Sequence, residues 1–197
     1  MNVIKRNGSI EELSYNKIIV RLQQLAPEIN IAYSNLVLKI MDQLYDNIPT
    51  YKIDELMAEL CASLGSHHYD YSTLANKLCI SNHHKDTPKT ILSCIESIQH
   101  GYLSPEYYNF VLLNHEYIDS IIDYSRDYLI DYFGFKTLER AYLIKNNGKV
   151  VERIQHLWMR VAIQIHCPNL EKIKETYNGL STKEFIHATP TLYNAGT

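Results

Sequence analysis

The chain has 197 residues, of which 46% are hydrophobic and 21% charged, a composition that indicates a folded globular protein and excludes a disordered or low-complexity polymer. Its formal net charge of -3 gives no electrostatic basis for non-specific nucleic-acid binding, although a local basic cluster could still hold one nucleotide. No apolar run approaches the roughly 18 residues of a membrane-spanning helix, and the first residues lack the layout of a secretory signal. The length allows one large domain or two small ones.

The first residues predict a β-hairpin followed by a helix. Two short alternating segments, 3–6 and 9–13, flank the dipeptide Asn7-Gly8, which favours a tight turn because both of its positions accept positive φ. Ser14 is a good N-cap, and apolar residues recur at helical spacing after it, up to Pro27.

Three further amphipathic helices are expected in the first half of the chain. Apolar residues at helical spacing predict a second helix over 37–44, a third from a cap at Thr50 to Gly65, and a fourth over about 71–85. Short connections between such helices favour an antiparallel bundle. The first ninety or so residues therefore predict a hairpin packed on four helices.

The second half of the chain is also predicted to be helical. Helical spacing recurs in five segments: 91–98, 107–113, 118–124, 155–165 and 170–180. Pro105 suits the first turn of the helix that follows a break at Gly101. A second Asn-Gly dipeptide, Asn147-Gly148, predicts another short hairpin, while 185–197 contains few periodic apolar residues.

The cysteines and histidines give no clear metal or redox site. The four cysteines are widely separated and none forms a C-x-x-C, so we interpret Cys61, Cys79 and Cys94 as small helical hydrophobes in a reducing, cytosolic environment. His67-His68 and His83-His84 are adjacent pairs, but no cysteine or carboxylate completes a ligand spacing near them. We therefore interpret both pairs as surface histidines and expect no bound metal. We interpret most of the 16 tyrosines as packing residues with a hydrated hydroxyl.

A few cations indicate a possible polyphosphate site. Lys5 and Arg6 flank the first turn, and Lys17 and Lys85 lie further along the chain. A Lys-Arg pair on a hairpin is more often a solvated edge, and the glycine motifs of P-loop and Rossmann sites are absent. The neighbouring carboxylates Glu11-Glu12 face opposite sides of a strand and cannot act together as acid and base. The residues alone thus indicate a helical protein without a visible catalytic constellation.

Two groups of motifs occur in order along the whole chain. The first group comprises VIKRNG at 3–8, Glu11, Lys17-Ile18 and SNHHK at 81–85. The second group comprises YFGFKTLER at 132–140, GKVVER at 148–153, Gln155-His156 and HATPTLYNAGT at 187–197. The first group resembles an ATP-cone, a hairpin-capped helical module that binds ATP or dATP as a regulator. The second group resembles the large (alpha) subunit of class I ribonucleotide reductase.

This resemblance implies a fold and a division into domains. The implied protein is mainly α, with an N-terminal β-hairpin capping a four-helix bundle, the ATP-cone, over 1–91. A second all-helical segment with a short hairpin would cover 92–197 and lead into a catalytic α/β barrel that lies beyond it. We accordingly expect the chain to be the N-terminal portion of such a large subunit.

The resemblance also implies an effector site, carried over position by position. Lys5, Arg6 and Lys85 would meet the phosphates of ATP or dATP, which would bind together with Mg, while the chain itself would bind no metal. The segment 11–17 would wrap the adenine, with Glu11 and Asn16 reading its edges. Thr50 would lie against phosphate and Asp54 against ribose, where a carboxylate can accept from a hydroxyl that dATP lacks. The complete set is Lys5, Arg6, Glu11, Glu12, Leu13, Ser14, Tyr15, Asn16, Lys17, Thr50, Asp54 and Lys85. Thr189 matches a position that contacts the phosphates of the substrate.

The same resemblance implies the activity and partners of the complete enzyme. It would reduce ribonucleoside diphosphates to deoxyribonucleotides for DNA synthesis, in the cytoplasm and with no nucleic acid or membrane as a partner. A small subunit would supply a radical, thioredoxin or glutaredoxin would supply electrons, and large subunits would form a homo-oligomer. The four cysteines match none of the family's catalytic cysteines, so we expect no catalytic residue in this chain and no activity from it alone.

Two other functions are compatible with parts of the sequence. A free-standing ATP-cone could act as a nucleotide-sensing regulatory protein, but the motif at 187–197 argues against it. A zinc-ribbon repressor with an ATP-cone would need cysteine pairs that are absent. A plain helical scaffold with a decayed effector site is the remaining alternative.

Overall fold

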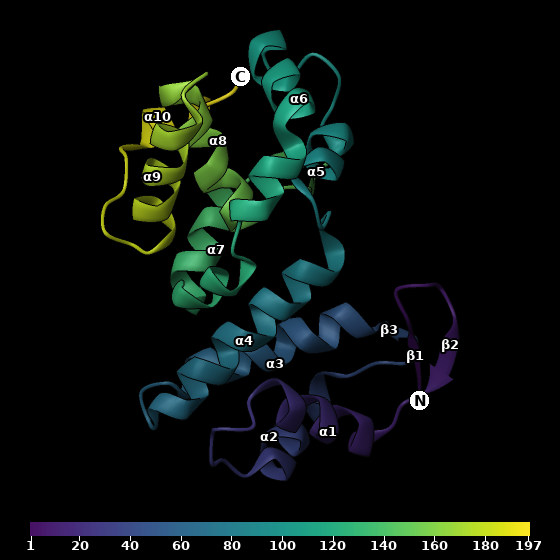
Figure 1. The fold of residues 1–197 in the computed structure, drawn as a ribbon. Coiled ribbons are helices and arrows are strands. Elements are labelled where there is room, and N and C mark those ends of the chain that lie inside the picture. The colour runs from purple at the N-terminus through teal and green to yellow at the C-terminus, as the bar shows by residue number, and fades with distance from the viewer. The chain divides into compact units, whose positions relative to one another are not determined.

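The computed structural model describes all 197 residues and is mainly helical, with two small groups of strands (Figure 1). The chain forms two compact units: an N-terminal unit of residues 1–82 and 131–135, and a C-terminal unit of residues 83–130 and 136–197. The predicted fold class, a mainly α protein with two hairpins, is confirmed. None of the helices is both long and apolar enough to cross a membrane.

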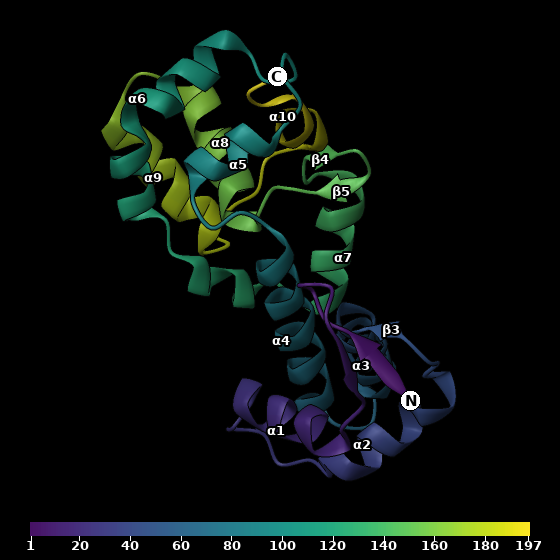
Figure 2. The same cartoon turned by 90° about the vertical axis from the view of Figure 1, so that its right-hand side faces the viewer.

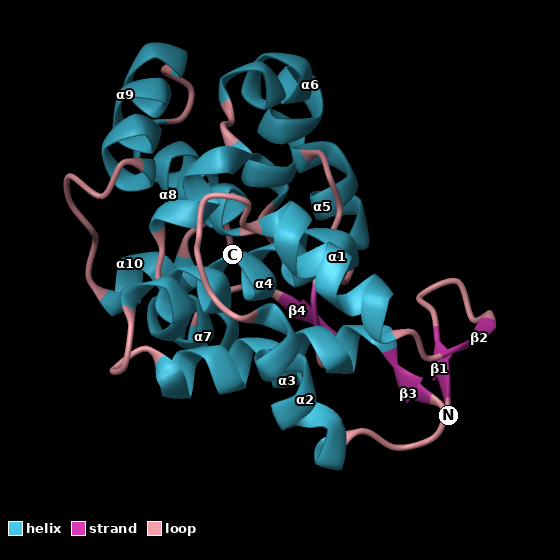
Figure 3. Cartoon of the chain, turned by 90° about the horizontal axis from the view of Figure 1, so that it is seen from below, coloured by secondary structure: helices cyan, strands magenta, loops and turns pink.

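Three short strands form the sheet of the N-terminal unit (Figure 3). Strands β1 (Asn2–Ile4) and β2 (Ile10–Glu12) pair antiparallel as predicted, and Gly8 in their turn has φ 83°. Strand β3 (Ile48–Pro49) was not predicted, and it pairs parallel to β1 with Ile4 opposite Pro49. This register brings the residues that follow β1 to the start of the next helix.

Four helices complete the N-terminal unit. They are α1 (Tyr15–Leu25), α2 (Tyr33–Ile40), α3 (Thr50–Leu64) and α4 (Tyr69–Asp86), the last of which continues into the C-terminal unit. Ser14 caps α1 as predicted, because its hydroxyl accepts from the backbone N–H of Lys17 at 3.4 Å. The core consists of fully buried apolar side chains from all four helices and from β3: Leu22, Ile40, Ile48, Met57, Leu74 and Leu78.

Two details of this unit differ from the predictions. The second helix ends at Ile40 and continues only as a 3-10 turn, η1 (Met41–Gln43), because the chain must then turn, with Asn47 at φ 61°, to form β3. Thr50 does not cap α3: it is the first helical residue, and Pro49 holds the cap position with no side-chain hydrogen bond. The pairing of Pro49 with Ile4 fixes that residue as strand, so the helix begins directly after it.

The C-terminal unit is built around one buried helix, α8 (Ile154–His166), with ten consecutive buried residues from Ile154 to Ile163. Figures 1 and 2 show it among the other helices of this unit. These are α5 (Ile91–Ser97), α6 (Pro105–Ile121), the 3-10 helix η2 (Tyr124–Leu129), α7 (Tyr132–Ala141, which begins in the N-terminal unit), α9 (Leu170–Ser181) and α10 (Thr189–Asn194). The predicted hairpin consists of β4 (Lys145–Asn146) and β5 (Lys149–Val150).

The helix α6 corrects another prediction. We expected two helices, over 107–113 and 118–124, because the polar residues between them interrupt the apolar spacing. The structure has one helix, which Ser104 caps and Pro105 starts. Its polar middle is tolerated because helix formation needs only one apolar face.

A buried ion pair anchors α8. Arg160 and Glu152 are each 1% exposed, and the Arg160 guanidinium donates to both Glu152 oxygens at 2.7 and 3.0 Å. Its remaining Nη1 donates to the carbonyl of Ala195 at 2.6 Å, while Glu152 also accepts from the backbone N–H of Ile144 at 3.0 Å. The pair therefore joins α8, the hairpin strands and the residues after α10.

The glycine after α10 fits closely against this pair. Gly196 has φ 74°, and a Cβ at this position would lie 3.1 Å from Cγ of Arg160. Its backbone N–H donates to Gln164 at 2.9 Å, and its carbonyl accepts from the N–H of Ser104 at 2.9 Å. Only glycine combines this conformation with such close contact.

Replacing Arg160 by methionine should lower the free energy of unfolding by about 3–5 kcal/mol, because the Glu152 carboxylate would stay buried without its partner. The double variant Arg160→Met/Glu152→Leu should lose less than Arg160→Met alone, since it leaves no buried charge. Urea denaturation measures both, with the exposed Lys149→Met as control. A loss below about 1 kcal/mol for Arg160→Met would show that the pair is not an anchor.

Candidate functional site

Charged side chains of the first hairpin and α1 form a small cluster at the surface. The Nζ atoms of Lys5 and Lys17 lie 3.6 and 2.8 Å from the same oxygen of Glu11. The hydrogen bond and charge of Lys17, with a smaller effect of Lys5, hold the pKa of the Glu11 carboxyl below its ordinary value. The cluster is exposed, so it contributes little to stability and stays accessible to a ligand.

A second polar contact joins the hairpin to α3 and α4. The guanidinium of Arg6 donates to Oδ1 of Asn82 on α4. The amide of Asn82 in turn donates to the carbonyl of Tyr51, in the first turn of α3, at 3.4 Å. Arg6 is thus held close to the start of α3, where the pairing of β1 with β3 also brings Lys5.

The start of α3 is suited to an anion. No side chain caps this 15-residue helix, and its first turn contains no acidic residue. The N–H groups of a first helical turn point outward along the axis and carry the positive end of the helix dipole. With Lys5 and Arg6 beside it, this helix end combines three features that stabilise bound phosphate.

Asp54 lies one turn further along α3 and is almost completely buried, at 6% exposure. Nε and Nη2 of Arg21 on α1 donate to its two oxygens, each at 2.8 Å. Arg21 was not among the predicted residues, and neither were Asn82 and Tyr51. Arg21 lies on the same face of α1 as Ile18 and Leu25, and this position is the sequence signal that could have indicated a buried partner.

The other predicted site residues occupy varied positions. Glu12, Tyr15 and Asn16 are exposed at the end of β2 and the start of α1, whereas Leu13, Ser14 and Thr50 are half-buried. Lys85 is exposed in the last turn of α4, in the part of this helix that belongs to the C-terminal unit. Thr189 is exposed at the first position of α10, and its hydroxyl lies 3.0 Å from that of Tyr142.

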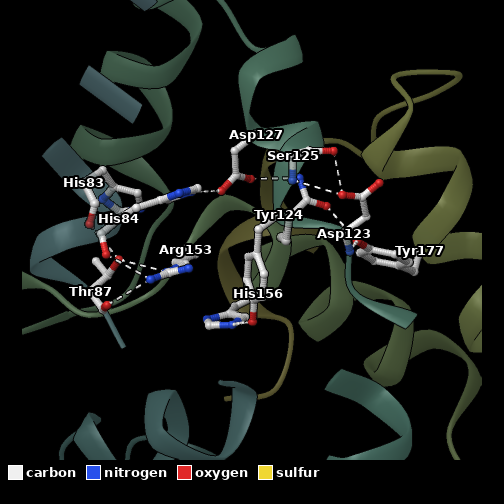
Figure 4. A network of polar contacts seen from close by, with 11 residues as sticks. His83, His84, Thr87, Asp123, Tyr124, Ser125, Asp127, Arg153, His156 and Tyr177 are labelled. Carbon is white, nitrogen blue, oxygen red and sulfur yellow. Dashed lines mark hydrogen bonds and ion pairs between the residues drawn. The ribbon is translucent and has the colours of Figure 1, made fainter. Parts of the chain in front are cut away.

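The prediction of surface histidines is correct for His67 and His68 and wrong for the second pair. His83 is 6% exposed, and Nε2 of His84 lies 2.5 Å from an oxygen of the fully buried Asp127 (Figure 4). The prediction failed because the last turn of α4, which contains both residues, belongs to the C-terminal unit and meets Asp127 there, a contact between distant segments that helical spacing cannot show. No group of three or more histidine, cysteine or acidic side chains is arranged to hold a metal ion.

Arg153 joins the end of α4 to this network. Its guanidinium donates to the carbonyl of His84 at 2.9 Å and to the hydroxyl of Thr87 at 3.2 Å, and it lies 4.9 Å from the centre of the Tyr124 ring (Figure 4). A cation placed at free carbonyls stabilises the C-terminus of a helix. Arg153 therefore fixes where α4 ends within the C-terminal unit.

Gln155 extends the network towards α9. Its amide donates to the second oxygen of Asp127 at 2.8 Å, and its carbonyl accepts from the Tyr177 hydroxyl at 2.9 Å. The Tyr177 oxygen also accepts from the backbone N–H of Asp123 at 2.9 Å (Figure 4). Each of these polar groups is hydrogen-bonded to the next, which indicates a structural network rather than a catalytic one.

The buried imidazole of His156 is not fully hydrogen-bonded. It is fully buried, its Nε2 lies 2.7 Å from the Tyr124 hydroxyl, and its Nδ1 has no hydrogen-bond partner. Burial, and then the charge of Arg153, lower the pKa of this imidazole to about 3, so it is neutral over the physiological range.

The cysteines lack the environment of reactive thiols. Cys61, Cys79 and Cys94 are buried in helices, as predicted, whereas Cys167 is exposed just after α8. Burial raises the pKa of Cys61 to about 12 and that of Cys94 well above its ordinary value. Thiols of this kind carry almost no nucleophilic thiolate at neutral pH.

Two domain families match this sequence. Residues 1–86 match the ATP cone domain, and residues 128–197 match the all-alpha domain of ribonucleotide reductase.

Curated relatives match the chain along its whole length. It is 42% identical to the ribonucleoside-diphosphate reductase large chain 2 of Saccharomyces cerevisiae, 41% to the large subunit of Danio rerio and 39% to that of Plasmodium falciparum (isolate Dd2). Each alignment covers 100% of this chain but only 24%, 26% and 26% of the respective relative. The chain thus spans about a quarter of the length of these relatives.

The buried neutral His156 predicts a loss of stability in acid. Because its pKa is about 3 in the folded chain and 6.5 ordinarily, the unfolded chain binds the extra proton between these values. The free energy of unfolding should therefore fall as the pH drops below about 6.5, by up to about 1.4 kcal/mol per pH unit for this residue. Burial lowers the pKa of His83 to about 3 as well, which adds to the loss.

The variant His156→Gln should reduce this acid loss. Urea denaturation gives the free energy of unfolding at pH 7.5 and at pH 5.5. The decrease in this free energy between the two pH values should be about 1 kcal/mol smaller for His156→Gln than for the original chain. The matched control is His67→Gln, which replaces an exposed histidine and should leave the difference unchanged. An equal difference in all three proteins would contradict the assignment of a neutral buried imidazole.

Proposed function

The chain belongs to the family of ribonucleoside-diphosphate reductase large subunits and contains an ATP cone and the all-alpha domain of that family; on this premise we propose that its first 91 residues bind ATP or dATP as an allosteric effector. The observation that carries the proposal is the meeting of Lys5 and Arg6 with the uncapped start of α3. Ammonium, guanidinium and backbone N–H donors together suit a triphosphate.

The proposed site assigns the parts of the nucleotide to separate elements. Lys5, Arg6, Thr50 and Lys85 bind the phosphates, with Mg supplied alongside the nucleotide. The segment 11–17 contacts the adenine, where Glu11 and Asn16 offer acceptor and donor groups. Asp54, one turn beyond the phosphate-binding end of α3, faces the ribose.

Effector binding in this site controls the activity of a complete reductase. Control of this kind requires that ATP and dATP favour different states or assemblies of the enzyme, because a ligand shifts an equilibrium only through differential affinity. The complete enzyme reduces ribonucleoside diphosphates to deoxyribonucleotides in the cytoplasm, as a homo-oligomer of large subunits with a radical-generating small subunit. Thioredoxin or glutaredoxin returns its electrons, and Thr189 contacts the phosphates of the substrate.

A free-standing nucleotide-sensing module is the second candidate. The ATP cone match at 1–86 favours it as much as it favours a reductase. The additional match of residues 128–197 to the all-alpha domain favours the reductase, since a sensor that works alone has no need of that domain.

Calorimetric titration of the purified chain with ATP and dATP tests the effector site. We expect binding of both, with affinity reduced about ten- to a hundredfold in Lys5→Ala and in Arg6→Ala, because each variant removes a charged donor from the phosphates. The matched control Lys39→Ala, which removes an exposed cation from α2, should bind as the original chain does. Absence of binding by the original chain would leave the scaffold alternative.

The chain alone should not reduce nucleotides. Three of its cysteines are buried in helices, and burial raises the pKa of two of them, so no pair can form and re-form a disulfide during turnover. An assay with CDP, ATP, dithiothreitol and a class I small subunit should yield no dCDP. Any turnover above that of a sample without the chain would refute the assignment of catalysis to other parts of the reductase.

A further inference from the structure

We propose that Asn147, in the turn of the β4–β5 hairpin, is a site of covalent modification, at which the side-chain amide is lost and aspartate or isoaspartate is formed. The chain contains three Asn-Gly dipeptides, at 7–8, 147–148 and 178–179. The fold holds the reacting groups of the first and third dipeptides and leaves those of the second free. The reaction is independent of any ligand at the proposed effector site.

The modification takes place within the dipeptide, with water as the co-reactant. The backbone nitrogen of the glycine attacks the side-chain carbonyl carbon of the asparagine. A C–N bond forms, and the side-chain nitrogen leaves as ammonia with the proton of the attacking N–H. Water then opens the resulting succinimide ring at one of its two carbonyls, which gives aspartate or isoaspartate. Glycine hinders this attack least, because it has no Cβ.

The second dipeptide forms a two-residue turn in which both reacting groups are free. Asn146 pairs with Lys149, and the residues between them, Asn147 and Gly148, have φ values of 49° and 79°. In such a turn the ladder hydrogen bonds join the flanking residues, so the N–H of the second turn residue lies outside the ladder. Neither the Gly148 N–H nor the Asn147 side chain forms a hydrogen bond within the chain, and both residues are exposed on the hairpin (Figure 2).

The first dipeptide is equally exposed, but hydrogen bonds hold both of its reacting groups. The N–H of Gly8 donates to the carbonyl of Lys5 at 2.9 Å. Oδ1 of Asn7 accepts from the backbone N–H and the hydroxyl of Ser9, at 3.0 and 2.8 Å. Hydrogen bonding, and not exposure, therefore distinguishes the two turns.

The third dipeptide lies inside a helix. Gly179 is buried in α9, where its N–H takes part in the helical hydrogen bonding. Oδ1 of Asn178 accepts from the guanidinium of Arg126 at 2.8 Å. Ring closure at Asn178 would therefore require the end of α9 to unwind.

The hairpin around Asn147 is also the easiest of the three sites to distort. Closure of the succinimide ring takes the asparagine out of its turn conformation, so the turn must open locally. Strands β4 and β5 pair through two residues each and belong to no larger sheet, whereas β1 has a partner strand on both sides. A hairpin of two strands is marginally stable by itself, so opening costs less free energy at Asn147 than at Asn7.

The two products change the hairpin in different ways. Either product adds a negative charge in the turn between Lys145 and Lys149. Isoaspartate also lengthens the main chain by one atom, because the chain then runs through the former side chain. A two-residue turn cannot absorb this atom without disturbing the pairing of β4 with β5 and the hydrogen bond from the Asn146 amide to the carbonyl of Ser97, at 2.8 Å.

The test is a peptide map of the purified chain during incubation at pH 7.5, with and without urea. Cleavage after glutamate releases the dipeptides in separate peptides, 1–11, 140–152 and 176–184, and mass spectrometry measures the conversion of each asparagine. In the folded chain, conversion at Asn147 should be at least about tenfold faster than at Asn7 or Asn178. A tenfold difference corresponds to about 1.4 kcal/mol, which is about the free energy of one hydrogen bond. In urea the three sites should convert at similar rates, since the dipeptide is the same.

The matched variant is Asn147→Gly, which removes the reactive amide and keeps a residue that accepts positive φ in the turn. Ion-exchange chromatography should show an acidic form that accumulates in the original chain and hardly at all in this variant. Conversion of Asn7 or Asn178 as fast as that of Asn147 in the folded chain would overturn the proposal. Conversion of Asn147 that occurs only in urea would overturn it as well.

Discussion

A guanidinium that is removed from water needs an acceptor for nearly every donor it carries, and this requirement determines how the C-terminal unit is assembled. The guanidinium of Arg160 finds its acceptors in the Glu152 carboxylate and the carbonyl of Ala195. These hydrogen bonds bring α8, the hairpin strands and the residues after α10 together. The apolar burial of α8 supplies most of the stabilising free energy, but it is not directional. The ion pair selects one arrangement of these segments among those that would bury the same surface.

In the N-terminal unit, arginine side chains also pair with polar partners, but these pairs lie beside the proposed ligand site. Arg21 holds Asp54, and Arg6 holds Asn82, so that α1, α3, α4 and the hairpin are joined through polar contacts close to the surface. The parallel pairing of β1 with β3 then places the hairpin cations beside a helix end that no side chain caps. Groups that stabilise the fold and groups available to a ligand are therefore neighbours on the same short elements.

The sequence predicted those features that depend on adjacent residues. Both Asn-Gly turns, the Ser14 cap and the spacing of apolar residues act locally, and the structure confirms the elements predicted from them. It did not predict β3, because a two-residue strand carries no periodicity and depends on a partner more than forty residues away. The burial of His83 and the pairing of Arg21 with Asp54 were missed for the same reason, since composition cannot show which helix faces meet. The nucleotide contacts of the effector residues stay predictions.

The position of Glu11 between Lys5 and Lys17 has a consequence for the ligands that such a site accepts. Glu11 acts as an internal counter-ion, so an incoming anion must exchange with a tethered carboxylate instead of displacing mobile ions from the solvent. Exchange favours an anion whose charge exceeds that of one carboxylate, which sets a threshold between triphosphates and singly charged anions. It also makes affinity less sensitive to ionic strength than two free ammonium groups would, because fewer dissolved ions are released.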